Sequence, residues 1–326
     1  MHVVMLGGTK FIGRAITEAL VARGDTVTVV HRGDTEPAGW VDCRHLHAAR
    51  ADFASVAGQV RSLRPDAVVD TLALTRADAG AVLPHLPETR LVLLSSMDVY
   101  HAFGLLLDDS EGEPLPVTEA SAVRPGRYPY RGREERAGLD DYDKLDVEPE
   151  YLARGGAVLR LAMIYGEHDP QHREEFILRR VRGGRRRIPV GPGTWLWTRC
   201  YVGDVASAAL AAIDTPAAAG EVFNVGEPEC RSMLGWARQI LAAAGHEAEL
   251  VGVPEPSVPE DLWETRSQPQ HLLVDSRKTM DLLGWRPGGQ AESIGRSVRW
   301  HLANPPAGAD TDFGADDKAL AAAGGG

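Results

Sequence analysis

Apolar and polar residues follow one another along the first half of the chain in blocks typical of strands and helices in alternation. Short apolar runs bounded by polar or glycine-rich residues predict strands at 2–6, 26–31, 67–71, 90–95 and 157–161. Longer amphipathic stretches predict helices around 13–23 and 53–63. Such alternation is typical of a parallel sheet covered by helices on both faces. The pattern therefore predicts an α/β fold with a doubly wound parallel sheet, and the chain is long enough for a smaller C-terminal lobe.

The first predicted strand runs directly into a glycine-rich segment, and a helix follows. The segment reads Gly7-Gly8-Thr9-Lys10-Phe11-Ile12-Gly13. Its first glycine permits a tight turn, its second lets the backbone approach a pyrophosphate, and its last lets the helix pack closely on the sheet. The helix N-terminus offers free N–H groups and a partial positive charge to phosphates. We therefore expect a Rossmann-type fold that binds a dinucleotide, with an ordinary strand–turn–helix unit as the alternative.

Composition narrows the class of protein. The chain has 326 residues, 44% of them hydrophobic, and a net charge of −11. This charge argues against bulk affinity for nucleic acid or anionic membranes. No apolar run is long enough to span a bilayer, and the three cysteines show no metal-binding spacing. We therefore expect a cytoplasmic protein with a small-molecule substrate, without a metal and without a nucleic-acid or membrane partner.

The composition also changes along the chain. Residues 1–166 are expected to form mainly the dinucleotide-binding domain, and 167–304 mainly a substrate lobe, with 199–226 returning to the sheet. Residues 108–137 are rich in proline, glycine, arginine and acids, which predicts an irregular substrate loop or a surface excursion. Residues 305–326 contain few large apolar side chains and are predicted to be a disordered tail.

Further short motifs follow the glycine-rich segment. They are Ser95-Ser96-Met97-Asp98-Val99-Tyr100, Lys144 with Glu148, Leu159-Arg160 leading to Tyr165-Gly166, Arg199-Cys200-Tyr201-Val202 with Asp204, Phe223-Asn224-Val225-Gly226, and Val274-Asp275-Ser276 with Leu283-Gly284-Trp285-Arg286-Pro287. In this order, and up to about residue 300, the chain resembles the extended short-chain dehydrogenase/reductase family of NAD-dependent nucleotide-sugar epimerases and dehydratases. The resemblance implies an NAD(P)-dependent enzyme that acts on a nucleotide-activated sugar or a related polyhydroxylated metabolite through a transient ketone. It also implies a homodimer. Simple NADPH-dependent reduction is the nearest alternative.

Two positions depart from the family pattern. Lys10 stands where the family usually has its middle glycine, a variant similar to the atypical branch that includes the chloroplast stem-loop RNA-binding proteins. The family's catalytic helix carries Tyr-x-x-x-Lys, whereas Asp140 lies four residues before Lys144. In the family, this lysine holds the nicotinamide ribose and lowers the pKa of the tyrosine, so that the phenol exchanges protons near neutral pH.

Tyr142 is the candidate replacement for the missing tyrosine. It lies two residues before Lys144, and two helical steps rotate a side chain by roughly 200°. The two side chains can therefore meet only if the helix begins after Tyr142, and the Asp140-Asp141 pair resembles an N-terminal cap. Tyr142 is either a displaced catalytic tyrosine or a packing residue.

The segment 95–100 follows a predicted strand and should lie at the carboxyl edge of the sheet, where ligands bind in such folds. By the resemblance, Ser96 polarises the reacting carbonyl or alcohol. Asp98 takes the place of a glutamate that removes a proton beside a keto group, and a dry pocket would raise its pKa. Asp98 otherwise caps a helix or lies in a solvated loop. Tyr100 is expected to bind substrate.

The second predicted strand ends in His31-Arg32-Gly33, without the acid that NAD-specific enzymes place against the ribose 2′-hydroxyl. Arg32 either pairs with a 2′-phosphate, which favours NADP over NAD, or faces solvent. By the resemblance, Asp52 and Phe53 contact adenine. The remaining cofactor contacts implied by the family are Thr71, Leu72, Ala73 and Lys144.

For the substrate, the resemblance assigns the nucleotide diphosphate to Arg199, because a guanidinium forks onto phosphate oxygens. Trp195 and Trp197 either stack on a ring or belong to the lobe core. The basic run 179–187 either binds phosphate or an acidic partner, or is a salt-bridged helix end. A second class of function is an RNA-binding or redox-sensing module that has lost catalysis, which salt-dependent RNA binding would favour.

Overall fold

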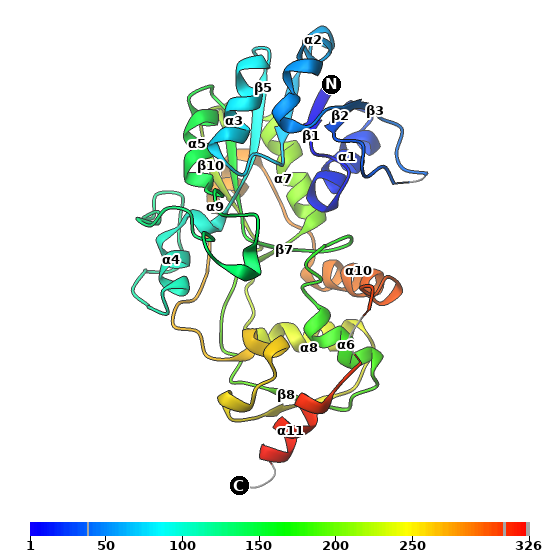
Figure 1. Ribbon diagram of the computed structural model, residues 1–326, viewed down its shortest axis with the longest axis vertical. Coiled ribbons are helices and arrows are strands. Elements are labelled where there is room, and N and C mark those ends of the chain that lie inside the picture. Colours follow the sequence, from blue (N-terminus) through cyan, green and yellow to red (C-terminus); the bar gives the residue numbers. More distant parts are fainter. Residues whose placement is uncertain (38, 309–310, 324–326) are drawn as a thin grey trace.

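The computed structural model describes residues 1–37, 39–308 and 311–323, and a seven-stranded parallel sheet forms the middle layer of its upper half (Figure 1). The strands are β1 (His2–Leu6), β2 (Thr26–His31), β3 (Arg44–His47), β4 (Ala67–Asp70), β5 (Arg90–Ser96), β6 (Ala157–Leu161) and β10 (Val222–Val225). Their order is β10-β6-β5-β4-β1-β2-β3, so the strand order reverses between β1 and β4. Ligands of doubly wound sheets bind in the crevice at that reversal. The predicted doubly wound, Rossmann-type fold is confirmed.

Helices cover both faces of this sheet. On one face α1 (Phe11–Arg23) packs against α7 (Val202–Asp214), and on the other lie α2 (Ala54–Ser62), α3 (Arg76–Val82) and α5 (Lys144–Leu152). Successive residues of β1 enter different cores, with Val3 and Met5 in one apolar cluster and Val4 and Leu6 in the other. Both faces of the strand are therefore buried, which is why it reads as a continuous apolar run rather than an alternating one.

A second lobe lies below the sheet in Figure 1. It contains α6 (Glu175–Arg182), α8 (Met233–Ala243), α10 (Gln290–Ala303) and the parallel pair β8 (Arg187–Val190) and β11 (Glu249–Gly252). Strands β7 (Met163–Tyr165) and β9 (Arg199–Tyr201) form another parallel pair. The remaining helices are α4 (His101–Leu107), α9 (Arg277–Leu283) and α11 (Gly314–Ala323). After β9 the chain returns to the main sheet through α7 and β10, which pairs with β6.

Two segments differ from the expectations. Strand β3 was not predicted, because its four residues, three of them polar, carry too little apolar signal. Residues 314–323 form helix α11 instead of a disordered tail, while 309–310 and 324–326 lie outside the described residues. Ion pairs rather than apolar bulk attach this helix, since Asp316 is 1% exposed and its carboxylate lies 2.6 Å from the buried guanidinium of Arg180. In the described part of the chain, no helix has both the length and the apolar character needed to cross a bilayer.

Candidate functional site

The glycines at the turn between β1 and α1 are packed too closely to be replaced by residues with a side chain. Gly7 has a φ of +79°, and a Cβ atom there would lie 2.4 Å from Cγ of Leu72. A Cβ at Gly13 would lie 2.1 Å from the carbonyl oxygen of Gly7. At Gly8 the neighbours are the side chains of Thr17 and Val29, so this glycine serves the packing of α1 on the sheet. The glycine spacing brings the helix N-terminus to the crevice, as predicted.

Lys10 explains how the family's middle glycine can be absent. Its backbone is extended, with a φ of −130°, so this position makes no demand for glycine. The left-handed conformation falls instead on Phe11, at a φ of +35°. Lys10 is also the N-cap of α1, and its side chain makes no capping hydrogen bond. The first N–H groups of this helix are thus left to a ligand, with the helix dipole behind them.

A cleft of about 360 Å³ lies over the carboxyl ends of β1 and β2. Of the predicted cofactor residues it is lined by Gly7, Thr9, Lys10, Arg32, Phe53, Thr71 and Leu72. Asp52, expected beside adenine, is exposed and is not among the lining residues. Its side chain points to solvent at the end of a 3-10 turn, and Arg50 from the same turn faces the cleft instead. Arg50 is held by Asp70 through two hydrogen bonds of 3.0 and 2.6 Å.

The rim of this cleft changes the interpretation of Arg32. Its side chain is 71% exposed and its Nε lies 3.2 Å from a carboxylate oxygen of Asp34, which lines the same cleft. The cleft therefore does contain an acid, Asp34, two residues after Arg32. The positive charge of Arg32 is partly neutralised, which weakens the argument for a 2′-phosphate.

A second cavity, of about 420 Å³, continues the first and shares Lys10, Thr71 and Leu72 with it. Its lining brings together the predicted residues Phe11, Ile12, Gly13, Ser96, Asp98, Tyr142 and Lys144, and adds Tyr130, Arg136, Arg173 and Trp197. Ala73 lies behind this wall, and its carbonyl oxygen accepts a hydrogen bond of 2.7 Å from Nζ of Lys144. The structure thus gathers all four predicted catalytic side chains in one place.

Asp98 is the centre of the cavity's chemistry. It is 3% exposed, and its Oδ2 accepts hydrogen bonds from the hydroxyls of Tyr142 at 2.8 Å and Tyr130 at 2.9 Å. Its Oδ1 has no partner among the described residues. Burial raises the pKa of Asp98, and burial followed by the charge of Asp98 raises the pKa of Tyr142 well above its usual value. Burial and the charge of Asp98 also raise the pKa of Tyr130, so both phenols are neutral hydrogen-bond donors to Asp98.

Helix α5 begins after Tyr142, as a displaced tyrosine requires. The cap is Asp143, whose carboxylate accepts from the N–H of Leu145 at 3.0 Å, and the expected cap at Asp140-Asp141 is wrong. Asp143 takes this place because Arg124 and Arg127 bind its carboxylate at 3.1 and 2.8 Å.

Lys144 is the first residue of α5 and is 4% exposed. Its Nζ donates to the carbonyl oxygens of Ala73 and Leu94 at 2.7 and 2.8 Å. Burial lowers its pKa to about 8. The hydroxyl of Tyr142 donates to Oδ2 of Asp98 at 2.8 Å, so the side-chain partner of this tyrosine is Asp98.

A third cavity, of about 720 Å³, opens toward the C-terminal lobe and shares Tyr130, Arg136, Arg173 and Trp197 with the second. Four arginines line it, Arg133, Arg136, Arg173 and Arg179, together with the indoles of Trp195, Trp197 and Trp263. Acidic residues also border it, namely Glu175, Glu260, Asp261 and Glu264. Trp263 is 41% exposed, so its ring is accessible for stacking. Arg179 belongs to the basic run noted in the sequence, and Arg133 and Arg136 lie in the predicted substrate loop, but none of Arg133, Arg136 and Arg173 was singled out, because none stands in a motif.

Two predicted substrate residues lie elsewhere. Arg199 is 3% exposed in the lobe core, with its guanidinium 4.1 Å from the ring centre of Trp236 and a hydrogen bond to the carbonyl of Arg231. Tyr100 is 1% exposed, and its hydroxyl donates to Oδ1 of Asn224 at 2.6 Å. Neither lines the three cavities, because packing within the lobe and against β10 directs both side chains inward.

The basic run 179–187 is largely paired with acids. Arg179 and Arg180 bind Asp261 at 2.6 and 2.7 Å, and Arg180 also binds Asp316. Arg182 pairs with Glu175. The salt-bridged interpretation therefore describes this segment better than a free basic patch does.

Comparisons with known proteins agree with this fold. The model of the NAD dependent epimerase/dehydratase family matches residues 147–226. The chloroplast stem-loop binding protein of 41 kDa b from Arabidopsis thaliana is 25% identical over 311 residues, 87% of this chain and 75% of that protein. Among solved structures, UDP-glucose 4-epimerase from Bifidobacterium longum in complex with NAD⁺ and UDP has a TM-score of 0.69 at 18% identity, covering 94% of this chain and 99% of that one. The dTDP-glucose 4,6-dehydratase from Bacillus anthracis in complex with NAD has a TM-score of 0.69 at 16% identity, with 94% and 97% covered. At these identities the structural likeness concerns the fold.

Proposed function

We propose that the chain is an NAD-dependent enzyme that oxidises and re-reduces a nucleotide-activated sugar or a related polyhydroxylated metabolite, which the match of residues 147–226 to the NAD dependent epimerase/dehydratase family supports. The observation that carries the proposal is the continuity of the three cavities, with the Asp98–Tyr142 pair in the middle one. A dinucleotide and a substrate bound in them would meet at that pair.

The residues around the first two cavities fit a nicotinamide dinucleotide. The contacts that exclude a Cβ at Gly7 and Gly13 keep the backbone close to the N-terminus of α1, where uncapped N–H groups suit a pyrophosphate. Phe53, 1% exposed, supplies an apolar wall for adenine. Lys144 lines the second cavity and would hold the nicotinamide ribose. When bound, the dinucleotide accepts hydride from the substrate carbon and returns it.

The tyrosine–aspartate pair supports a two-step proton relay. As the substrate alcohol is oxidised, its hydroxyl proton passes to the oxygen of Tyr142, and the phenol proton passes to Oδ2 of Asp98. The net result is a ketone and a protonated Asp98, so no tyrosinate has to form beside a carboxylate. Ser96 lines the same cavity and is available to donate a hydrogen bond to the new carbonyl oxygen. Return of the proton accompanies re-reduction.

The third cavity supports a nucleotide-linked substrate. Guanidinium groups of Arg133, Arg136 and Arg173 suit the oxygens of a diphosphate, and Arg173 also stacks over Trp197 with its carbon centre 5.4 Å from the ring centre. The accessible ring of Trp263 suits a base or a sugar face. We assign diphosphate binding to these residues in place of Arg199.

For the cofactor we propose NAD as the working form, because Asp34 faces the cleft beside Arg32. Titration with both dinucleotides tests this. Asp34→Asn should weaken NAD⁺ binding and strengthen NADP⁺ binding, whereas Arg32→Ala should weaken only NADP⁺ binding. A wild-type protein that binds NADP⁺ more tightly than NAD⁺ would reverse the assignment.

RNA binding is the second candidate, since one relative is named as a stem-loop binding protein. The pairing of Arg179, Arg180 and Arg182 with acids argues against a surface built for phosphates. A fluorescent stem-loop RNA titrated at low and moderate salt distinguishes the two. Salt-dependent binding without any sugar conversion would favour the RNA function.

The experiment for the proposed function has two parts. The protein is first denatured and any released dinucleotide is identified by mass spectrometry. It is then incubated with NAD⁺ and a panel of UDP- and dTDP-hexoses, and products are analysed by mass spectrometry and NMR. Epimerisation leaves the mass unchanged and dehydration removes one water, whereas simple reduction requires a parallel incubation with NADPH, which it consumes stoichiometrically. Failure to bind either dinucleotide and to convert any sugar would refute the proposal.

A further inference from the structure

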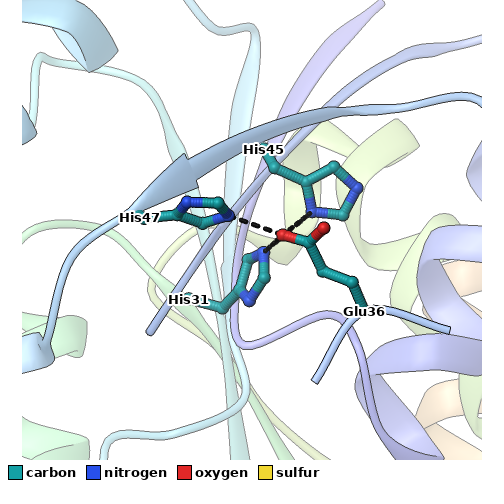
Figure 2. A group of neighbouring side chains, drawn as sticks. All are labelled: His31, Glu36, His45 and His47. Atoms are coloured by element: carbon teal, nitrogen blue, oxygen red, sulfur yellow. Dashed lines mark hydrogen bonds and ion pairs between the residues drawn. The ribbon is translucent and has the colours of Figure 1, made fainter. Parts of the chain in front are cut away.

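Three histidines and a glutamate meet at the edge of the main sheet (Figure 2). His31 is the last residue of β2, His45 and His47 lie on β3, and Glu36 lies on the connection between these strands. The parallel register places His31 opposite His47. Because side chains alternate along a strand, His45 and His47 share one face of β3, and pairing brings His31 to the same face.

The three imidazoles point at one carboxylate oxygen. Oε1 of Glu36 lies 2.5 Å from Nε2 of His47, 3.4 Å from Nε2 of His31 and 3.7 Å from Nδ1 of His45. Nε2 of His31 and Nδ1 of His45 are 2.8 Å apart, and all four donor atoms lie within 4.8 Å of one another. Ligands about 2.0–2.2 Å from a tetrahedral zinc ion are separated by roughly 3.3 Å, so small side-chain rotations complete such a shell.

We propose that His31, Glu36, His45 and His47 form a binding site for a transition-metal ion, best suited to Zn²⁺. Imidazole nitrogens with one carboxylate oxygen are ligands that zinc prefers in proteins. The ion would occupy the point of convergence, from which the Glu36 carboxylate withdraws to become the fourth ligand. The side chains of Glu36 and His47 are 44% and 56% exposed, which provides a route from solvent. This inference does not depend on the proposed enzymatic function.

Contacts behind the ligands bear on how the ion would be held. Nε2 of His45 lies 3.5 Å from Sγ of Cys43, which leaves its Nδ1 directed at the cluster. The N–H of Gly33 donates to Nδ1 of His31 at 3.2 Å. A metal bond at Nε2 of His31 moves the ring proton to Nδ1, so this contact with Gly33 must be given up.

The site would also adjoin the cofactor cleft. His31 lines that cleft itself, and Arg32 and Asp34 lie on either side of Gly33 and line it too. Release of the Gly33 contact therefore shifts the segment that faces the adenosine end of the cleft. We infer that zinc changes the affinity for a dinucleotide, which is a second property to measure.

The test uses the full chain without a histidine tag, stripped with a chelator and dialysed against equimolar Zn²⁺. Elemental analysis should find one zinc per chain, and Co²⁺ in its place should give the visible absorption of a tetrahedral site. His47→Ala and Glu36→Gln alter exposed side chains, and each should weaken Zn²⁺ binding by more than about tenfold. The double variant with His45→Ala and His47→Ala should weaken it by more than about 100-fold. His85→Ala removes a histidine outside the cluster and should bind zinc as the wild type does.

Two results would overturn the assignment. One is a wild-type protein that retains no stoichiometric zinc after dialysis. The other is a folded His47→Ala or Glu36→Gln protein, as judged by circular dichroism, whose zinc affinity equals that of the wild type.

Discussion

Asp98→Asn separates the tyrosine–aspartate relay from the tyrosine–lysine mechanism of the wider family. Asparagine has nearly the same shape and can still accept a hydrogen bond from Tyr142, but it cannot take a proton from it. If Asp98 is the final proton acceptor, the variant loses general-base catalysis, which contributes typically 10² to 10⁴ in rate, or about 3–5 kcal/mol of barrier.

The fold should survive this change. Two hydrogen bonds to a carboxylate, from Tyr130 and Tyr142, become bonds to a neutral amide, which costs roughly 1 kcal/mol each. Removing a charge that is 3% exposed recovers a similar amount, because a buried carboxylate is poorly solvated. The melting temperature is therefore expected to stay within a few degrees of the wild type, so a loss of rate reports on chemistry.

The pH profile gives the sharper test. The relay needs the Asp98 carboxylate, whose pKa is raised by burial, so wild-type kcat/KM should fall as the pH drops through that raised value. The acidic limb should vanish in Asp98→Asn. Tyr130→Phe removes one donor to the carboxylate, so its pKa should rise and the limb should move to higher pH, with a rate loss below about tenfold. Tyr142→Phe should lose as much rate as Asp98→Asn.

The assay measures kcat/KM against pH for whichever nucleotide sugar the panel identifies, with dinucleotide binding measured separately as a control for an intact site. An Asp98→Asn enzyme that is as fast as the wild type, or that keeps the same acidic limb, would refute the relay and return the base function to Tyr142 with Lys144.

Three further predictions concern the scaffold. Gly13→Ala places a Cβ 2.1 Å from a backbone oxygen, so it should lower the free energy of unfolding by about 1–3 kcal/mol and abolish dinucleotide binding. Its control is Gly58→Ala, where no atom lies within 4 Å of the added Cβ, and this variant should be neutral or stabilising in thermal unfolding. Burial raises the pKa of Glu174 from 4.5 to about 7, so between these pH values the folded state binds a proton that the unfolded state has released. The free energy of unfolding should therefore fall by about 3 kcal/mol as the pH rises from 4.5 through 7. The urea midpoint of Glu174→Gln should lack this dependence on pH. A pH dependence equal to that of the wild type would contradict the assignment. Asp316→Ala removes a buried partner of Arg180 and should destabilise the lobe by about 3 kcal/mol in urea unfolding, an effect that Asp316→Asn should reduce.

Local sequence patterns were sufficient to predict the structure where a single strand or turn determines it. Val3 to Leu6 are buried on both faces, so β1 shows an unbroken apolar run, and Gly13 is required by its close contact with Gly7 in the same turn. The register of β1 with its neighbours then brings Thr71 and Leu72 to the same crevice. These features explain why the fold and several of the residues that line the first cleft were predictable from sequence.

Side chains whose roles depend on long-range packing were not predictable in this way. Arg199 and Arg173 are both arginines of the second lobe, but Arg199 is directed into the core by Trp236 while Arg173 lines the cavity. Tyr130 belongs to an irregular segment without a motif, and only the fold brings it to Asp98. The proposed metal site was not predictable for the same reason. His45 and His47 show the spacing of residues on one strand face, but only the register of the sheet brings His31 beside them.

The replaced tyrosine and the irregular segment 108–137 are parts of one arrangement. Arg124 and Arg127 of that segment bind Asp143, which ends the loop at Tyr142 and starts α5 at Lys144. Arg124 also donates to the carbonyl oxygen of Asp98. Tyr130 of the same segment donates to the Asp98 carboxylate, and Arg133 and Arg136 of the segment line the third cavity. Substrate contacts that order this segment would therefore also fix the positions of Tyr142 and Asp98, so a change in the loop should affect kcat as well as KM.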